Sequence, residues 1–340
     1  MKTRCAILLS FAAAVCTFGS IDAAAQIVAT RTGDVRGVTS AGITSFKGIP
    51  YAAPPLGALR WKPPQPPSSW QTVLVAEKTG PACMQSKGEI DARIPISEDC
   101  LYLNVWRPAA AQPNARLPVM VFIHGGGFVG ETASSSLTDA SSLARNGVIA
   151  VTLNYRVGRF GWFAYPELSA EAGEAATGNF GMMDQLAALR WVRDNIAAFG
   201  GDPARVTLFG ESAGGISVNA LMGVAAARGL FSAAITESGF GRNNAAPLNA
   251  AETMGAAFAK AAGASDLAAL RALPAETVLS TAADDPNAAP PGLILDGKLM
   301  QANIAEVFAK GAQARIPWIV GSTIMRRASI PTASRIPTRP

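Results

Sequence analysis

TLFGESAGGIS, residues 207–217, joins a strand-like run to a helix-like run and contains the pattern G-x-S-x-G at residues 210–214. In a nucleophile elbow of this pattern, a strand turns sharply into a helix and exposes a serine at the turn. Gly210 and Gly214 lack Cβ atoms, so the backbone closes the turn without clashes. The motif alone is weak evidence, but its place after VTLF and before an apolar helix strengthens it. Ser212 is therefore the candidate nucleophile, and its helix N-terminus helps to stabilise developing negative charge.

A second motif, FIHGGGFVG at residues 122–130, follows another strand-like run. Its consecutive glycines allow backbone N–H groups to face one point in space. Together with the N–H of Ala213 they predict an oxyanion hole, the electrostatic part of acyl transfer. A flexible loop is the alternative interpretation. The only histidine of the sequence, His124, lies in this motif, and we interpret it as support for the loop rather than as the base of Ser212.

The rest of the sequence predicts an α/β fold with a mostly parallel sheet, because buried-strand patterns alternate with helical patterns. Continuous apolar runs occupy residues 117–123, 147–155, 205–210, 231–239 and 316–321, and helical spacing occupies residues 179–201, 212–223, 250–263 and 266–273. Before them, residues 33–52 resemble an antiparallel meander. The prolines of residues 51–70 exclude a regular helix there.

The composition and charge of the sequence limit the classes of function that the protein could have. The 340 residues are 49% hydrophobic and 16% charged, which favours a sizeable buried core. The net charge is +5, but four arginines in the last residues and the cations near the start account for it. The body of the chain is therefore close to neutral and has no basic stripe, which argues against a nucleic-acid partner.

Residues 1–25 combine early cations, an apolar run and small residues at the end, the pattern of a signal peptide cleaved after Ala25. We therefore expect a secreted or periplasmic protein, with a membrane anchor as the alternative. No later stretch is long enough to span a membrane. Cleavage leaves one pair of cysteines, Cys83 and Cys100, which in an exported protein suggests one disulfide. Two free buried thiols are the alternative.

Taken together, the ordered motifs resemble the type-B carboxylesterase family, which includes the cholinesterases. The resemblance covers residues 30–322 and rests on GIPYAAPPLGALRW, SEDCLYLNVW, HGGGF, NYRVGRFGWF, GNFGMMDQLAALRWVRDNIAAFGGDPARVTLFGESAGG and LDGKLM. It implies an α/β-hydrolase fold, hydrolysis of a small-molecule ester through an acyl-enzyme, and no metal or organic cofactor. Oligomeric state cannot be read from these motifs.

The same resemblance assigns a role to each candidate site residue. It implies that Ser212 is the nucleophile, that Gly126, Gly127 and Ala213 supply the oxyanion N–H groups, that Cys83 and Cys100 form a disulfide, that Arg60 and Glu98 form a structural ion pair, and that Glu211 lines the site. A structural role for Glu211 is an equal alternative.

The C-terminal residues depart from the family pattern. The family order is serine, acid, histidine, and the acid follows the strand that matches residues 316–321. Here Arg326 or Arg327 stands where the glutamate is expected, and no acidic residue follows Glu306. We therefore expect one domain over residues 26–322, a non-family tail over residues 323–340, and a truncated or frameshifted chain without the acid and base of the triad. A natural mobile tail is the alternative, and a non-catalytic binding module or a defective gene product is the alternative function.

Overall fold

The computed structural model describes residues 26–86, 88, 90–239, 245–281, 285, 290 and 292–322. The predicted signal peptide and the predicted tail both lie outside these residues. Within the described residues, no helix is long and apolar enough to cross a membrane.

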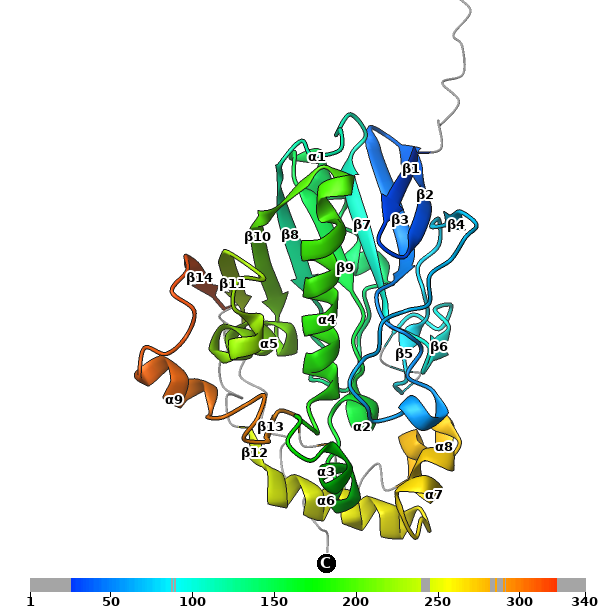
Figure 1. The fold of residues 1–340 in the computed structure, drawn as a ribbon, viewed down its shortest axis with the longest axis vertical. Coiled ribbons are helices and arrows are strands. Elements are labelled where there is room, and N and C mark those ends of the chain that lie inside the picture. Colours follow the sequence, from blue (N-terminus) through cyan, green and yellow to red (C-terminus); the bar gives the residue numbers. More distant parts are fainter. Residues whose placement is uncertain are drawn as a thin grey trace, which may run out of the picture.

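A central mixed sheet organises the fold (Figure 1). Its strand order is β1-β2-β3-β7-β9-β8-β10-β11-β14, with β4 paired to β2. The bounds are β1 Gln26–Thr30, β2 Gly33–Ser40, β3 Ile43–Pro50, β4 Leu74–Val75, β7 Tyr102–Pro108, β8 Leu117–Ile123, β9 Ile149–Leu153, β10 Gly201–Glu211, β11 Ala233–Glu237 and β14 Trp318–Gly321.

The direction of pairing changes at β9. From β9 through β8, β10 and β11 to β14 every pair is parallel, which is the part that the continuous apolar runs predicted. From β1 through β2, β3 and β7 to β9 every pair is antiparallel. The meander of residues 33–52 is thus one wing of the same sheet, and the sheet as a whole is mixed rather than mostly parallel. All five residues of β9 are buried, as expected for a strand covered on both faces.

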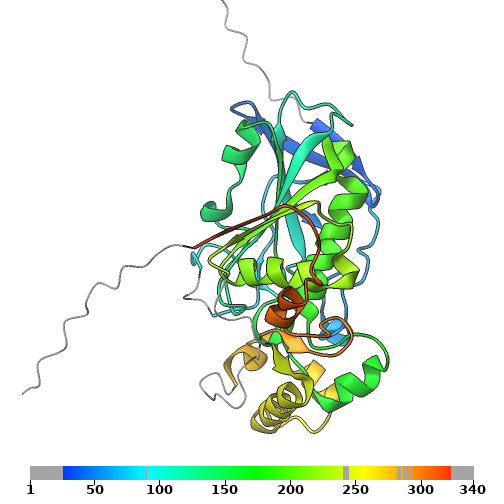
Figure 2. The ribbon, with the colours of Figure 1, turned by 90° about the vertical axis from the view of Figure 1, so that its left-hand side faces the viewer.

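Helices cover both faces of the sheet. Figure 2 shows α1 (Ser141–Arg145) on one face and α4 (Phe180–Asn195) on the other. On the α1 side, Trp106 and Ala150 pack with Ala144. On the α4 side, apolar residues three or four positions apart bury one stripe of the helix: Met182, Leu186, Leu189 and Val192.

Apart from α5 and α6, the remaining elements are short. They are η1 Gly57–Leu59, β5 Ala82–Cys83, β6 Ile96–Ser97, η2 Ser136–Thr138, α2 Gly158–Gly161, α3 Pro166–Ala172, η3 Ile196–Phe199, α5 Ala213–Gly223, η4 Ala225–Ala227, β12 Ala246–Pro247, α6 Leu248–Ala261, α7 Leu267–Ala272, α8 Ala275–Ser280, β13 Ile294–Leu295 and α9 Ile304–Ala309. The proline-rich residues 51–70 form only the single turn η1, in agreement with the sequence.

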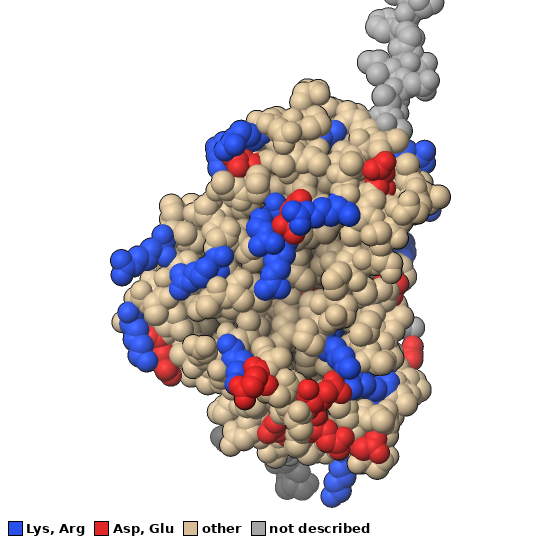
Figure 3. All heavy atoms as spheres, viewed as in Figure 1, with Lys and Arg blue, Asp and Glu red and all other residues tan. Residues whose placement is uncertain are grey.

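A second apolar cluster lies beside the main core, where α6, α7 and α8 meet the segment after η1. Trp61 stacks on Phe163 with ring centroids 4.6 Å apart, and Phe258 meets Phe163 edge-on at 5.7 Å. Leu270 and Val278 are fully buried in this cluster. On the face of the molecule drawn in Figure 3, basic side chains lie singly or beside acidic ones.

Candidate active site

Ser212 occupies a sharp turn between β10 and α5. Its backbone has φ 54° and ψ −119°, a region that non-glycine residues rarely adopt. Close backbone packing requires the flanking glycines. A Cβ added to Gly214 would lie 2.0 Å from the carbonyl oxygen of Ile123, and one added to Gly210 would lie 2.5 Å from the Gly214 carbonyl carbon. The elbow predicted from the sequence is therefore formed, and the Ser212 N–H donates to the Glu237 carbonyl at 2.9 Å.

The glycine loop, residues 124–131, leaves the end of β8 and lies against Ser212. A Cβ added to Gly125 would lie 3.2 Å from the Ser212 Cβ. Gly126 and Gly127 have φ values of 84° and 62°. Among the residues that the structure describes, the amides of Gly126, Gly127 and Ala213 donate to no protein acceptor.

His124 is held within the glycine loop. Its side chain is 2% exposed, and its Nδ1 lies 3.1 Å from the Gly125 carbonyl oxygen. The imidazole stacks on the Tyr155 ring at 4.3 Å, and the Tyr155 hydroxyl donates to the His124 carbonyl at 3.0 Å. Burial lowers the pKa of His124 to about 4, so the ring is neutral at pH 7. These contacts fit the supporting role that we inferred for His124.

Three carboxylates surround the elbow. Glu211 ends β10 and pairs in register with Glu237 at the end of β11. Partial desolvation, followed by the charges of Glu237 and Glu131, raises the pKa of Glu211. Glu131 belongs to the glycine loop, and no pattern in the sequence pointed to it. The Glu211 side chain, which the resemblance places along the site, is exposed, and Glu237 and Glu131 give it a negative electrostatic environment.

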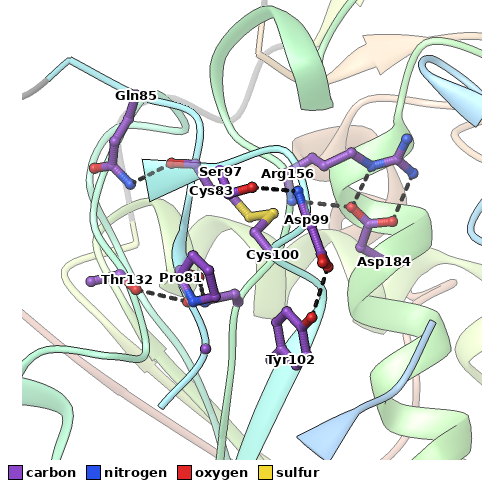
Figure 4. Close-up of a disulfide and its surroundings, with 12 residues drawn as sticks. Pro81, Cys83, Gln85, Ser97, Asp99, Cys100, Tyr102, Thr132, Arg156 and Asp184 are labelled. Carbon is purple, nitrogen blue, oxygen red and sulfur yellow. Dashed lines mark hydrogen bonds and ion pairs between the residues drawn. A yellow bond between two sulfur atoms is a disulfide. The ribbon is translucent and has the colours of Figure 1, made fainter. Parts of the chain in front are cut away.

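The predicted disulfide is confirmed. Cys83 in β5 is bonded to Cys100 just before β7, with an S–S distance of 2.06 Å and the Cα atoms 5.0 Å apart (Figure 4). Both cysteines are buried in the main core. Gln85, two residues after Cys83, points from the same segment toward the glycine loop, a contact that we did not predict from the sequence.

Arg60 and Glu98 lie together at the border of the second cluster. Arg60 Nε lies 2.7 Å from Glu98 Oε2, and Arg60 Nη2 lies 2.5 Å from Oε1. The two side chains are only 6% and 10% exposed. Arg60 Nη1 also donates to the Leu273 carbonyl at 2.6 Å, so the pair connects η1 with the C-terminal end of α7.

Sequence reasoning missed a second buried pair, between Arg156 and Asp184. Arg156 Nε and Nη2 each lie 2.7 Å from an Asp184 carboxylate oxygen, and Asp184 belongs to α4. Figure 4 draws this pair beside the disulfide. Both residues stand in motifs that carried the family resemblance, NYRVGRFGWF and GNFGMMDQ, which was the one signal available.

Comparison with known proteins adds context. A family model described as "Carboxylesterase family" matches residues 24–330. The chain is 44% identical over 313 residues to the para-nitrobenzyl esterase of Bacillus subtilis (strain 168), covering 88% of this chain and 62% of that protein. It is 39% identical over 301 residues to the fumonisin B1 esterase of Sphingopyxis macrogoltabida, covering 86% of this chain and 54% of that protein.

Comparison with solved structures also finds esterases. A PNB esterase structure matches with a TM-score of 0.79 at 42% identity, covering 88% of this chain and 63% of that one. The carboxylesterase EST55 of Geobacillus stearothermophilus matches with a TM-score of 0.79 at 40% identity, covering 87% of this chain and 61% of that one. The chain thus spans less than two thirds of the length of each of these four proteins.

Proposed function

The chain belongs to the carboxylesterase family, and we propose that its site is built to hydrolyse a small-molecule carboxylic ester with Ser212 as the nucleophile. The observation that supports this most directly is the contact between the elbow and the glycine loop. A Cβ on Gly125 would lie 3.2 Å from the Ser212 Cβ, so the loop amides border the place where an ester carbonyl would sit.

The proposed chemistry proceeds in two steps. Ser212 Oγ attacks the ester carbonyl carbon, and the carbonyl oxygen becomes an oxyanion that accepts hydrogen bonds from the amides of Gly126, Gly127 and Ala213. The tetrahedral intermediate then collapses, the alcohol leaves with a proton, and the acyl group stays on Ser212. Water attacks the acyl-enzyme, releases the carboxylic acid and restores the serine.

Proton transfer is the step that this sequence does not support. Its one histidine, His124, is buried, neutral and bonded to its own loop. We therefore propose that Ser212 has no base in a polypeptide of these 340 residues. Removing the base of a serine triad costs about 10⁶ in turnover in a well-studied protease, or roughly 8 kcal/mol of barrier. The oxyanion hole alone retains about 10³–10⁴ over water.

Hydrolysis of p-nitrophenyl acetate by the purified chain, by Ser212→Ala and by Ser142→Ala tests this proposal. Ser142 is exposed and stands on α1, away from the elbow, so it serves as a matched control. We expect all three rates to be equal and close to the spontaneous rate, because the residual catalysis by the oxyanion hole is hard to detect against the fast spontaneous hydrolysis of this activated ester. A Ser212-dependent rate of ordinary enzyme size would show that a base exists, and His124→Ala would then be the next variant.

A fluorophosphonate probe separates the esterase from the alternative, a non-catalytic binding module or a defective gene product on the same scaffold. The observation that favours this alternative is that His124, the one histidine of the sequence, is buried and bonded to its own loop. Weak labelling that requires Ser212 indicates an intact nucleophile and oxyanion hole that lack only the base. Complete absence of labelling, even after long exposure, favours the module that does not react with esters.

We further propose that the protein is exported, that cleavage follows Ala25, that residues 26–322 form one domain and that nucleic acid is not a partner. The disulfide between two buried cysteines supports an oxidising compartment. N-terminal sequencing of the protein recovered from the periplasm or the medium tests the cleavage. Gln26 should be the first residue, and an intact Met1 in that fraction would contradict the proposal.

A further inference from the structure

We propose that Gln85 is a positioning residue for the glycine loop and that it couples the disulfide segment to the candidate oxyanion hole. This inference deepens the proposed function and rests on it for the meaning of the loop. The contacts themselves are independent of that function. The contacts are made to the glycine loop, whose backbone conformation needs support from residues outside the loop.

The glycine loop holds several residues in the left-handed region. Besides Gly126 and Gly127, Phe128 has φ 67° and Glu131 has φ 74°. A side chain at positive φ is unfavourable by roughly 1–3 kcal/mol, and such conformations persist only where surrounding contacts hold them. Few contacts within the loop do so. The Gly126 carbonyl accepts from the amides of Val129 and Gly130, and neither bond fixes Glu131.

Gln85 supplies the missing contact at Glu131. Its Nε2 donates to the Glu131 carbonyl at 2.9 Å and to the Cys83 carbonyl at 3.0 Å. The side chain is 1% exposed, so both bonds are shielded from water. Figure 4 shows Gln85 beside the disulfide, with its amide nitrogen bonded to the Cys83 carbonyl. One amide group therefore links the backbone at Cys83 to the strained end of the glycine loop.

Neighbouring contacts hold the chain just beyond the loop. Asn154 Oδ1 accepts from the amide of Ala133 at 2.8 Å and from the hydroxyl of Thr132 at 2.9 Å. The Ser134 hydroxyl donates to the Gly80 carbonyl at 2.7 Å. Residues 132–134 thus have anchors of their own, whereas Glu131 depends on Gln85. Loss of the Gln85 amide should release residues 129–131 and leave residues 132–134 in place. Phe128 keeps its own anchors, because its carbonyl accepts from the Gly158 amide at 2.7 Å and its ring packs on Trp162.

Release of Glu131 would affect the proposed chemistry through backbone direction. The glutamate Cγ lies 2.7 Å from the position of a Cβ on Gly126, so the two residues pack directly on each other. If Glu131 leaves the left-handed region, Gly126 loses this packing, and its N–H, a donor in the proposed chemistry, is no longer held in place. Gln85 thus acts through the loop and touches no reacting atom.

Amide hydrogen exchange, read residue by residue, tests the proposal without requiring any ester turnover. Exchange measures local opening of the loop, so a failed esterase assay would not affect this result. In Gln85→Leu, which keeps the size but removes the donor, exchange of the Val129 and Gly130 amides, which bond to the Gly126 carbonyl, should rise about three- to tenfold, the effect of one typical hydrogen bond. Exchange in residues 132–134 and in α4 should stay unchanged.

Gln65→Leu is the matched control. Gln65 also donates its Nε2 to the carbonyl two residues earlier, that of Pro63, but it is exposed and lacks a second acceptor. It should leave the glycine loop as in the unmodified chain. Unchanged exchange of the Val129 and Gly130 amides in Gln85→Leu would overturn the proposal.

If Gln85→Leu also loses protection in α4, the substitution has destabilised the whole fold. Gln85→Glu then separates the effect of the hydrogen bonds from the effect of packing. The ionised carboxylate has no donor, so near pH 8 the loop should exchange as fast as in Gln85→Leu. On acidification the carboxyl group gains an O–H, and protection should return toward that of the unmodified chain. The other carboxyl groups near this position belong to Glu131, whose carbonyl Gln85 bonds, and to Asp91 and Glu276, which line a cavity with Gln85. The unmodified chain, measured at both pH values, corrects for them. Exchange in Gln85→Glu that matches the unmodified chain at both pH values would also overturn the proposal.

Discussion

Gly214 sets how closely the helix after the nucleophile approaches β8. A Cβ at this position would lie 2.0 Å from the Ile123 carbonyl oxygen, which is backbone and cannot rotate away. Gly214→Ala should therefore lower the free energy of unfolding by about 3 kcal/mol, the upper range for overpacking. Gly321→Ala is the control, because a Cβ there meets nothing within 4 Å and should change stability by about 0.5 kcal/mol or less. Urea unfolding of both variants measures this difference in stability. Equal midpoints would contradict the close packing that we infer for the elbow.

His124 gives the protein a pH dependence of stability. Burial lowers its pKa in the folded state to about 4, below the 6.5 of the free side chain. The unfolded chain therefore binds more protons between these values, and stability falls as the pH drops from 6.5 to 4. The full effect of this group is about 3 kcal/mol, present above pH 6.5.

Unfolding of the unmodified chain and of His124→Gln at pH 7.5 and pH 4.5 measures this contribution. The variant should lose much less stability on acidification, because glutamine does not titrate. Parallel losses in the two proteins would show that His124 is solvated enough to titrate normally.

Motifs revealed the residues whose role depends on local backbone shape, such as Ser212 and the glycines of the two loops. They did not reveal Gln85 or Glu131, and the motif that contains Asn154 did not indicate its contacts, because all three residues act through contacts between distant parts of the chain. Gln85 and Glu131 are 46 positions apart, and Asn154 bonds to Pro81 across 73 positions. Neither separation leaves a periodic or spaced pattern in the sequence. The supporting contacts of the site therefore required the structure.

At the scale of elements, hydrophobic runs predicted the buried parallel strands but not all their limits. β10 begins at Gly201, whereas the apolar run begins near residue 205, because Asp202 and Pro203 interrupt the hydrophobic pattern. The register with β8 is also irregular between Gly201 and Val206. β7 was not predicted as a strand, and it turns the meander and the parallel strands into one sheet. Pairing partners, unlike strand existence, depend on contacts that no local pattern records.

Reduction of the disulfide should increase amide exchange in the glycine loop. The Cys83–Cys100 bond closes a loop with a sequence separation of 17, so its loss should lower stability by about 3 kcal/mol. Freed motion of Cys83 should also loosen residues 129–131 in the unmodified chain, because Gln85 bonds to the carbonyls of both Cys83 and Glu131. In Gln85→Leu the link is already broken, so reduction should add no further exchange there.

Hydrogen exchange with and without reductant, run on both proteins, gives this double comparison. The melting temperature of each sample reports the general loss of stability separately from the loop. If reduction loosens the loop equally in both proteins, the coupling does not pass through Gln85.

At the scale of the molecule, β14 forms an apolar edge. In the part of the chain that the structure describes, β14 is the last strand of the sheet, and Figure 1 shows it beside β11 at one end. Ile319 and Val320 are 65% and 44% exposed on this strand. An exposed apolar edge offers unpaired backbone groups to another chain. We therefore expect a polypeptide of this sequence to associate as its concentration rises.

Sedimentation velocity over a concentration series measures this association. Ile319→Lys should reduce it, because a charged side chain on the edge opposes pairing. Leu137→Lys is the control, since Leu137 is 89% exposed but lies in η2 rather than on a strand edge. A monomer at every concentration, with cooperative unfolding, would contradict the prediction.

The order of the site residues along the chain also sets the order in which they are synthesised. Gln85, the glycine loop and Asn154 all emerge from the ribosome before Ser212. At about 5–20 residues per second, Ser212 follows Gly126 by roughly 4–17 s. Because β10 joins β8 on the side opposite β9, the loop and its supports are free to assemble first. Two of the three proposed oxyanion donors, Gly126 and Gly127, are thus synthesised before Ser212, and the third, Ala213, directly follows it.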